Sequence, residues 1–404
     1  MNSSPLIPVE EALRRVLDGA AALPSEEVPI AEAYGRVLAK PLASRRTQPP
    51  ADLSSMDGYA ARAADLAKPA TLKLIGASAA GRPFAGSLKP GETARIFTGA
   101  LLPTGADAVI PQEDAKAEGD KIALPASKPG QFVRKKGLDF AEGQILLDAG
   151  RRISARDVAL AAAMDHAKIP VAARPRVAII ATGDELVPPG SGAAADRTIA
   201  SNPLSLAALL RTENAEILDL GIVPDKLDIT SSTIRKARDA GVDILVTLGG
   251  ASVGEHDLVA KALAVEGVKI DFHRVALRPG RPMLLARMGT TRVLGLPGNP
   301  VSSYVCALLF LVPLLRKLQG RADFLPQPEP AILGKALPEN DHRQDYLRAK
   351  ITREPDGRLK AIALDRQDSS MLAYLSGADG LLIRPPHAPA AKSGDACQIL
   401  RFAD

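Results

Sequence analysis

Glycines and carboxylates follow one apolar run of the chain in a pattern that could bind an anion and a cation together. Ile244 to Val246 is typical of a strand buried on both faces of a parallel sheet. The residues that follow it are Gly249, Gly250, Ser252, Gly254, Glu255 and Asp257. Such glycines let backbone N–H groups converge on an anion, and a nearby carboxylate can hold a hard cation against a phosphate. Taken alone, the stretch fits such a site and an ordinary glycine-rich turn equally well.

Further carboxylates follow other apolar runs, and together they suit Mg²⁺. Glu185, Asp225 and Asp257 each come after a predicted strand, and Asp57 and Thr98 could be brought to them from a β-rich segment. Mg²⁺ takes a few oxygen ligands and keeps water and phosphate oxygens for the rest. Zinc is disfavoured, because the histidines are scattered and His256 has no ligand partner at a suitable spacing.

Each of these residues also has a plainer interpretation. Asp225 serves equally well as a helix cap, whereas for Asp257 we favour a ligand role. On local sequence alone Asp57, which precedes Gly58, is better explained as a turn residue. The hydroxyl of Thr98 could bind an anion or close a turn.

Two further segments could recognise an oxyanion. Arg278 and Arg281 flank a Pro-Gly turn, and planar guanidinium groups bind oxyanions through paired hydrogen bonds, although surface ion pairs are the commoner role. The segment Pro297-Gly298-Asn299-Pro300, with Ser302 behind it, joins a predicted strand to a helix and offers backbone N–H groups there. For this second segment we favour a functional role.

The elements that position these residues alternate as in an α/β domain. Predicted strands cover residues 177–181, 217–221, 242–248, 268–275, 283–286 and 292–296, and predicted helices cover 203–211, 229–240, a stretch from Leu258, and 303–315. This alternation predicts a doubly wound parallel sheet. Because the carboxyl ends of its strands share one edge, a single crevice can collect the candidate residues. That convergence is stronger evidence than any one motif.

The rest of the chain predicts three more units. A helix is expected over residues 8–17 and a second over 30–38, and residues 155–164 also read as helix. Short apolar runs between Gly and Pro predict an all-β insert, and a proline-rich linker near residue 326 precedes a small β-barrel or sandwich. The predicted domains are 1–48 with 143–173 (helical or mixed), 49–142 (β-rich), 174–325 (α/β) and 326–404 (β-barrel).

Composition narrows the classes of function. The 404 residues are enough for two to four domains, and 46% apolar with 24% charged residues is typical of a soluble globular protein. Aromatic residues make up 3% with no Trp, which argues against nucleic-acid binding by base stacking. The net charge of +5 fits anionic ligands or simply a solvated basic surface. Cys306 and Cys397 form neither a disulfide framework nor a zinc site. We expect a cytoplasmic protein without a signal peptide or membrane span.

The motifs in order resemble one known family. They are SMDGYA at residues 55–60, FTGA at 97–100, ATGDEL at 181–186, SN at 201–202, GGASVGEHD at 249–257, LPGNPVS at 296–302, DYLR at 345–348 and SSML at 369–372. Together they are specific, and the chain resembles the molybdopterin molybdenumtransferases, the MoeA family, which is related to the E domain of gephyrin. The resemblance covers essentially the whole chain.

The resemblance implies a reaction and an assembly. The family takes adenylylated molybdopterin and molybdate and, with Mg²⁺, yields molybdenum cofactor and AMP. Its members are elongated homodimers of four-domain subunits, and each site joins the α/β domain of one subunit to the β insert of the other. Transient contacts with the molybdopterin-adenylating enzyme, and with molybdoenzyme apoproteins or their chaperones, are also implied.

By motif, the resemblance also assigns roles to residues. Asp57, Glu185 and Asp257 would serve the Mg²⁺ and the adenylate phosphates, with Thr98 nearby. The pterin and its phosphates would be held by Gly249, Gly250, Ser252, Asn202, Pro297, Gly298, Asn299 and Ser302. Arg278, Arg281, Arg348 and Ser369 would lie near the molybdate. The family usually has lysines where this chain has Arg278 and Arg281.

Two rival interpretations remain at this point. An adenylyltransferase acting on molybdopterin would resemble the α/β domain alone, so the insert with Asp57 and the last domain argue against it. A catalytically inactive scaffold of the gephyrin kind is opposed by the presence of Asp57, Glu185 and Asp257 together.

Overall fold

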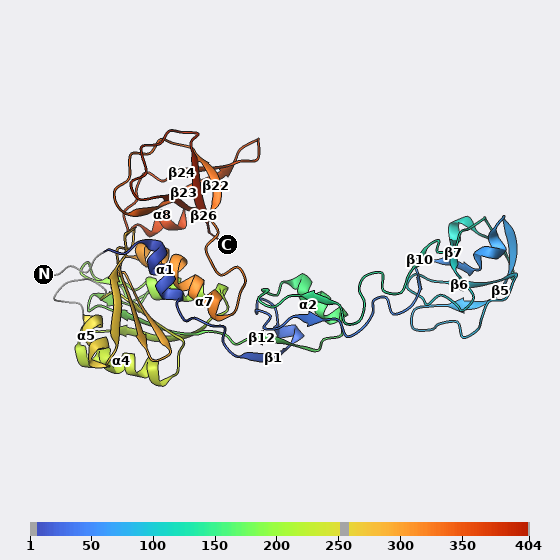
Figure 1. The fold of residues 1–404 in the computed structure, drawn as a ribbon, viewed down its shortest axis with the longest axis horizontal. Coiled ribbons are helices and arrows are strands. Elements are labelled where there is room, and N and C mark those ends of the chain that lie inside the picture. The colour runs from blue at the N-terminus through green and yellow to red at the C-terminus, as the bar shows by residue number, and fades with distance from the viewer. Residues whose placement is uncertain (1–5, 251–257, 403–404) are drawn as a thin grey trace.

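The molecule is elongated and is built from four units. The computed structural model describes residues 6–250 and 258–402. At one end an α/β unit carries a β-barrel, at the far end lies a β-rich unit, and a small mixed unit connects the two (Figure 1). This arrangement confirms the predicted class, a multidomain α/β plus β protein with an all-β insert and a C-terminal barrel.

The α/β unit is organised around one six-stranded sheet. Its strand order is β16 (Glu216–Val223), β13 (Arg176–Thr182), β17 (Ile244–Leu248), β21 (Thr291–Leu296), β20 (Pro282–Met288) and β18 (Lys269–Arg274). The first four strands are parallel, as predicted, but β20 pairs antiparallel with both β21 and β18. The predicted doubly wound parallel sheet is therefore correct for four strands and wrong for the pairings of β20. Only Gly289 and Thr290 join β20 to β21, and so short a connection permits only an antiparallel pair.

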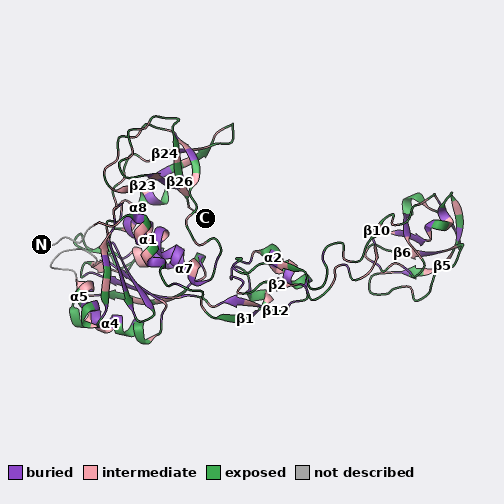
Figure 2. Ribbon diagram, in the orientation of Figure 1, coloured by how far each residue is buried: buried purple, intermediate pink, exposed green. Residues whose placement is uncertain are grey.

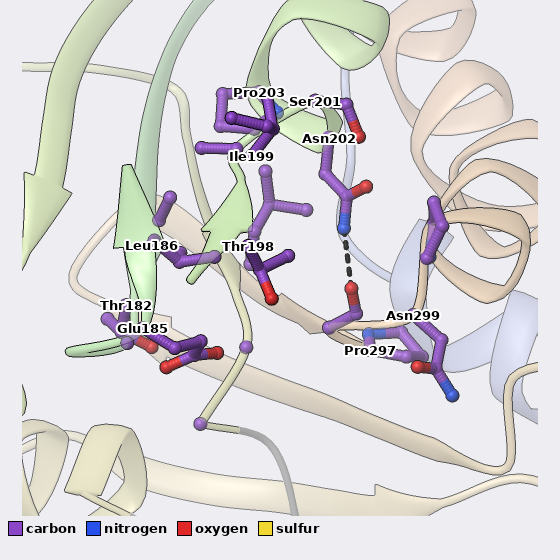
Figure 3. A pocket seen from close by; sticks show the side chains of 18 of the residues that line it. Thr182, Glu185, Leu186, Thr198, Ile199, Ser201, Asn202, Pro203, Pro297 and Asn299 are labelled. Atoms are coloured by element: carbon purple, nitrogen blue, oxygen red, sulfur yellow. Dashed lines mark hydrogen bonds between the residues drawn. The ribbon is translucent and has the colours of Figure 1, made fainter. Parts of the chain in front are cut away.

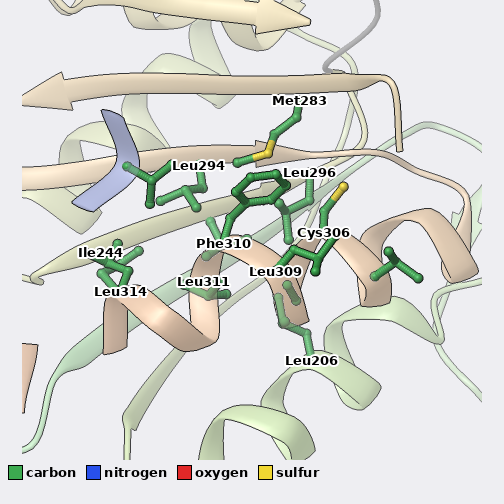
Figure 4. Packing of buried hydrophobic residues seen from close by; sticks show 14 of the residues in the cluster. Leu206, Ile244, Met283, Leu294, Leu296, Cys306, Leu309, Phe310, Leu311 and Leu314 are labelled. Carbon is green, nitrogen blue, oxygen red and sulfur yellow. The ribbon is translucent and has the colours of Figure 1, made fainter. Parts of the chain in front are cut away.

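Helices cover both faces of this sheet. One face packs against α1 (Val9–Leu17), α3 (Asn202–Thr212), α6 (Pro300–Cys306) and α7 (Val312–Leu318), and the other against α4 (Leu227–Asp239) and α5 (Leu258–Val265). Figure 2 shows the buried residues concentrated along these strands. Phe310, which is fully buried, packs beside Leu294 and Leu296 of β21 (Figure 4). This core fixes the strand ends that carry the candidate residues.

Helix α1 belongs to the α/β core, although we predicted residues 1–48 to form part of a separate unit. Ala12 and Val16 are fully buried in the same cluster as α7, and Lys317 donates a hydrogen bond to the carbonyl of Leu17 at 3.0 Å. The apolar stripe of α1 was visible in the sequence, but a stripe does not reveal which distant surface it covers.

Helices α6 and α7 form one helical run, Pro300–Leu318, joined by a π-helical turn at Ala307–Leu311. By length and composition these 19 residues could cross a membrane, but 78% of the most apolar 18-residue stretch among them is buried inside the protein. That burial is the pattern of a core helix. Pro313 lacks an N–H and would crowd the preceding turn of a regular helix, and the π turn lies immediately before it.

The connecting unit is mixed rather than helical. Strand β1 (Ser25–Pro29) pairs with β12 (Lys168–Ala172), and β2 (Leu42–Ala43) pairs with β11 (Ile145–Leu147). Helix α2 (Ala155–Ala163) begins with a capping box between Ser154 and Asp157. The prediction of a second helix over residues 30–38 was wrong. Only a 3₁₀ turn forms at Ile30–Glu32, because Gly35 adopts a φ of +74° and Val37 and Leu38 form isolated β-bridges to Arg152 and Val171.

The far unit is all β. Its six-stranded sheet has the order β7 (Ala108–Pro111), β4 (Gly58–Ala61), β6 (Glu92–Ile96), β5 (Ala70–Ser78), β9 (Lys121–Leu124) and β8 (Lys116–Glu118). Strand β3 (Leu53–Ser54) pairs with β10 (Val133–Arg134), and short 3₁₀ turns occur at Ala63–Leu66 and Gln112–Asp114.

The last unit is a closed five-stranded barrel. Strands β23 (Gln344–Arg353), β24 (Leu359–Ala363), β22 (Glu329–Leu333), β26 (Ala396–Arg401) and β25 (Gly380–Arg384) pair in this order, and β25 returns to β23. A short helix, α8 (Leu372–Ser376), lies beside α6. The α/β unit contributes one strand, β19 (Leu277–Arg278), which pairs with β23 and ties the two units together.

Candidate functional site

A cleft of about 880 Å³ lies at the carboxyl edge of the α/β sheet (Figure 3). The ends of β13, β17 and β21 line it, together with the start of α3 and the two-stranded ribbon of β14 (Leu186–Val187) and β15 (Thr198–Ile199). This is the edge at which open α/β sheets bind their ligands. The cleft brings together the predicted residues Glu185, Asn202, Asp225, Gly249, Gly250, Pro297, Gly298 and Asn299.

Acidic groups form one wall of the cleft. Glu185 follows β13, and its side chain folds back over Gly183, where an added Cβ would lie 2.5 Å from Oε2. Asp225 approaches from the turn after β16, and its backbone N–H donates to Asp184 Oδ1 at 3.1 Å. Partial burial, reinforced by the charges of Asp184 and Glu185, raises the pKa of the Asp225 carboxyl. Crowded carboxylates of this kind attract a cation.

The glycine turn after β17 approaches its neighbours too closely for any side chain. Gly249 and Gly250 have φ values of +89° and +64°, and an added Cβ would lie 2.8 Å from the Thr182 carbonyl or 2.6 Å from Val259. Thr182 is 5% exposed, and its hydroxyl has no hydrogen-bond partner among the residues that the structure describes. The turn is therefore built for close backbone approach, as an anion cradle requires.

Two asparagines connect the remaining walls. The amide of Asn202 donates to the carbonyl of Gly298 at 2.6 Å, the bond drawn in Figure 3. The amide of Asn299 donates to Ser369 Oγ at 2.9 Å, and the Val301 N–H donates to the Ser369 carbonyl at 3.0 Å. Ser369 belongs to the loop that joins β24 to α8, residues 364–371, which we call the barrel loop. The start of α6 thus uses one of its N–H groups on this loop, so fewer are free for a ligand than the sequence suggested.

Arg348 holds this barrel loop in place. It is 1% exposed, and its terminal nitrogens donate to the carbonyls of Asp368 at 2.8 Å and Arg366 at 3.1 Å. Its Nε has no partner among the described residues. Neither Arg348 nor Ser369 lines the cleft, whereas the neighbouring Ser370 and Leu372 do. The loop therefore forms a wall of the cleft, with Arg348 beneath it.

The two predicted oxyanion-binding arginines have different surroundings. Arg278 is bonded to Asp345 through both Nε and one terminal nitrogen, at 2.8 and 2.6 Å. Arg281 is exposed and follows the turn closed by Gly280, with no side-chain bond to any residue in the described ranges. Ser302 is 5% exposed and lies inside the first turn of α6, away from the cleft lining.

Asp57 and Thr98 lie together but far from this cleft. The backbone N–H and the hydroxyl of Thr98 donate to Asp57 Oδ1 at 2.7 and 2.8 Å, and these bonds lower the pKa of the Asp57 carboxyl. Both residues sit in the β-rich unit, at the opposite end of the molecule from the α/β unit (Figure 1). A single subunit therefore does not unite Asp57 with Glu185 and Asp225.

The predicted residues Ser252 and Asp257 fall outside the described ranges. Among the described residues, no three His, Cys, Asp or Glu side chains gather as a ready metal-binding cluster. Glu185 and Asp225 nevertheless both face the cleft, and Mg²⁺ in phosphate sites is often held by one or two carboxylates with water and phosphate oxygens completing its shell. The chemistry of these donors fits Mg²⁺.

Several cleft residues were not among our predictions. They include Leu186, Thr198, Ser201, Ser370 and Leu372. Thr182, at the end of β13, was expected in the crevice as part of the segment 182–185, and Ser201 lies inside a motif that we had singled out for Asn202. Ser370 and Leu372 belong to the SSML motif at residues 369–372, of which we had named only Ser369, whereas Thr198 carries no local signal because the fold alone brings it to the cleft.

Three family models match successive parts of the chain. The MoeA N-terminal region (domains I and II) matches residues 7–164, a probable molybdopterin-binding domain matches 178–317, and the MoeA C-terminal region (domain IV) matches 330–402. The fold and the cleft thus define a MoeA-type protein with a molybdopterin-binding-type α/β domain.

Relatives of known name agree over most of the chain. A molybdopterin molybdenumtransferase of Nostoc sp. is 40% identical over 74% of this chain and 70% of its own length. Molybdopterin molybdenumtransferase 2 of Mycobacterium tuberculosis is 32% identical over 97% of this chain and 98% of its own. The crystal structure of the MoeA protein from Pyrococcus horikosii matches with a TM-score of 0.86 at 31% identity, covering 99% and 100% of the two chains. The chain belongs to the MoeA family of molybdopterin molybdenumtransferases, enzymes of molybdenum cofactor biosynthesis.

Proposed function

We propose that this enzyme inserts molybdate into adenylylated molybdopterin in a Mg²⁺-dependent reaction that releases AMP and yields molybdenum cofactor. The observation that carries the proposal is the cleft, in which a glycine cradle, amide groups and two carboxylates meet. The cleft lies in the region that matches a probable molybdopterin-binding domain. The relatives are named molybdopterin molybdenumtransferases, and from that name we infer that the reaction transfers molybdenum.

Each wall of the cleft has a task in this reaction. The backbone at Gly249 and Gly250 cradles phosphate oxygens, and Asn202 and Asn299 shape the wall that faces the pterin. Glu185 and Asp225 would hold Mg²⁺, which when bound stabilises the negative charge that develops on the phosphates. Water attacks the adenylate phosphorus and AMP leaves. The two dithiolene thiols of the pterin bind molybdenum, and their two protons leave with one molybdate oxygen as water. No protein nucleophile is needed.

We further propose that two subunits complete each site. Asp57 and Thr98 form a polar pair. In their own unit they bond to each other, the Gln112 N–H donates to the Asp57 carbonyl at 3.0 Å, and the charge of Arg95 acts on the Asp57 carboxyl. Exposed apolar side chains surround them, including Met56, Phe97 and Leu101, which are 37–40% exposed. Apolar side chains also lie exposed beside the cleft: Ile199, Leu204 and Leu372. Docking the β-rich unit of one subunit onto the cleft of a second would cover both surfaces.

The same chemistry implies other proteins on either side of this step. An adenylating enzyme must supply the substrate, and the product must be handed to molybdoenzyme apoproteins or their chaperones. We propose that these contacts are transient and that the reaction takes place in the cytoplasm.

The test is AMP release by the purified protein with adenylylated molybdopterin, Mg²⁺ and molybdate. We expect molybdate-dependent AMP that is lost in Asp57→Ala and in Glu185→Ala. Glu118→Ala, which removes an exposed carboxylate of β8, is the matched control and should keep full activity.

Two results would replace the proposal. If AMP never forms but molybdopterin and ATP give the adenylate, the protein is an adenylyltransferase. If both assays are silent although the pterin binds tightly, the protein is a scaffold.

A further inference from the structure

We propose that Arg278 and Arg281 have divided roles: Arg278 is a positioning residue that clamps the barrel to the α/β unit, and Arg281 alone serves the oxyanion substrate. This inference rests on the proposed function, and it departs from the equal roles that the sequence suggested for the two residues. It is carried by the contacts of Arg278.

Barrel residues occupy four of the five N–H groups of the Arg278 guanidinium, although the side chain is 42% exposed. Its Nε and one terminal nitrogen bind the two carboxylate oxygens of Asp345 at 2.8 and 2.6 Å. The same terminal nitrogen donates to Asn340 Oδ1 at 3.0 Å, and the other donates to Asp341 Oδ2 at 3.4 Å. These carboxylates raise the pKa of the guanidinium. Only one N–H of the weakly bonded terminal nitrogen is left for a ligand, so a molybdate could bind Arg278 through paired hydrogen bonds only by displacing a carboxylate.

The backbone reinforces the same clamp. Arg278 lies in β19, where it pairs in register with Asp345 of β23, and the Gln344 N–H donates to the carbonyl of Ala276 at 2.9 Å. Asp345 is 6% exposed, so removal of its partner would leave a buried carboxylate without its charge pair. A side-chain fork and a strand pairing thus fix one edge of the barrel to the α/β unit.

The clamp leads directly to the cleft. Strand β23 carries Asp345 at the clamp and Arg348 three residues later, and Arg348 holds the carbonyls of Arg366 and Asp368. The loop so held continues to Ser369, which is bonded to Asn299, and to Ser370, which lines the cleft. A change at the clamp would therefore shift a wall of the substrate cleft without touching the substrate.

Arg281 shows the opposite environment. It is exposed, and its side chain makes no ion pair or hydrogen bond within residues 6–250 and 258–402. The residue after it, Pro282, lines the cleft. Beneath the turn, Gly280 lies against Cys306, where an added Cβ would be 2.5 Å from Sγ, so the turn that displays Arg281 is closely packed from below. A free planar fork on a packed turn beside the cleft suits oxyanion capture.

The experiment compares Arg278→Met, Asp345→Asn and Arg281→Met in the full chain. It measures the thermal midpoint, and kcat and KM for molybdate in the AMP-release assay. We expect Arg278→Met and Asp345→Asn to lower the midpoint by at least about 3 °C and to lower kcat, with little change in the molybdate KM. The double variant Arg278→Met with Asp345→Asn should have a thermal midpoint and a kcat no lower than those of either single variant, because both substitutions remove the same contact.

Arg281→Met should behave differently, with an unchanged midpoint and a molybdate KM raised roughly tenfold or more, because a charge-assisted contact is lost. If Arg278→Met fails to fold, Arg278→Lys keeps the charge without the fork and should show the same pattern in milder form. The proposal is overturned if the Arg278 variants raise the molybdate KM as Arg281→Met does, while Asp345→Asn changes neither the thermal midpoint nor the kinetic constants. It is also overturned if Asp345→Asn lowers that KM, which would mean that a released Arg278 binds molybdate. If the wild type releases no AMP, the proposed function fails, and the midpoints alone still test the clamp.

Discussion

At the scale of single residues, Asp57 and Asp225 have opposite electrostatic surroundings. Two hydrogen bonds from Thr98 favour the charged form of Asp57 and lower its pKa. Partial burial and the neighbouring charges of Asp184 and Glu185 disfavour the charged form of Asp225 and raise its pKa. We therefore expect the charge of Asp57 to stabilise the fold and that of Asp225 to destabilise it until a cation binds.

This difference predicts opposite effects of removing the two charges. At neutral pH, Asp57→Asn should lower the free energy of unfolding and Asp225→Asn should raise it. As the pH falls, Asp225 is protonated first, so the gain from Asp225→Asn should fade above pH 3.8, the unperturbed value for Asp. The loss from Asp57→Asn should persist to 3.8 and fade only below it, as the lowered pKa of Asp57 is reached. Urea unfolding at a series of pH values measures both.

Mg²⁺ and Thr98 provide the controls for this experiment. Added Mg²⁺ should stabilise the wild type at neutral pH and abolish the advantage of Asp225→Asn, since the cation neutralises the same carboxylates. In a Thr98→Val background, the effect of Asp57→Asn should shrink. Two variants that change stability with the same sign at neutral pH would contradict this electrostatic account.

At the scale of elements, the loop that carries Asp57 depends on a glycine. Gly58 begins β4, and an added Cβ there would lie 1.9 Å from the carbonyl oxygen of Ile110 in β7. The motif around Asp57 therefore requires Gly58 for the close pairing of β4 with β7, beyond any role in a turn.

Gly58→Ala should separate β4 from β7, because backbone atoms cannot yield as a flexible side chain would. We expect it to destabilise the β-rich unit by about 3 kcal/mol, the upper end of the usual cost of overpacking. Gly119→Ala is the matched control in the same unit: nothing lies within 4 Å of its added Cβ, and only its φ of +62° opposes the change. The control should cost about 1 kcal/mol. Chemical denaturation of the two variants tests this, and equal losses would show that backbone crowding at Gly58 is unimportant.

Periodicity predicted most elements well, and its failures have physical causes. The strands of the α/β sheet and the barrel follow from apolar runs between turn residues, and the parallel core follows from their alternation with helices. The antiparallel β20 depended on the length of one connection, and the missing helix after Ile30 depended on Gly35 and on strand pairing at Val37. The packing of α1 against α7 is a contact between the two ends of a long stretch of sequence, and no local pattern encodes it.

The site residues, too, could be predicted where local pattern and topology determine them, and not where long-range packing does. Residues at strand ends, such as Glu185, Asn202 and Asn299, could be placed in one crevice from topology alone. Topology could not place the barrel residues, because Ser370 reaches the cleft only through the packing of two domains; the motif resemblance alone pointed there, to Ser369. Nor could the sequence show that Arg278 is already occupied by Asp345, since that bond joins residues 67 positions apart.

At the scale of the whole molecule, the elongated shape separates Asp57 and Thr98 from the cleft (Figure 1). The middle unit holds them apart with its own packed core, which includes Leu38 and Ile169. The site that we propose needs both ends of the chain and would therefore be completed between subunits. This is the central claim of the account, and it requires a dimer with two equivalent sites.

The most direct test mixes two inactive variants. Asp57→Ala and Glu185→Ala subunits are co-expressed so that they pair at random, and molybdate-dependent AMP release is measured. In a mixed dimer, one site receives both defects and the other receives none, so the mixture should regain about a quarter of the wild-type activity. A mixture as inactive as each variant alone would contradict a site shared between subunits.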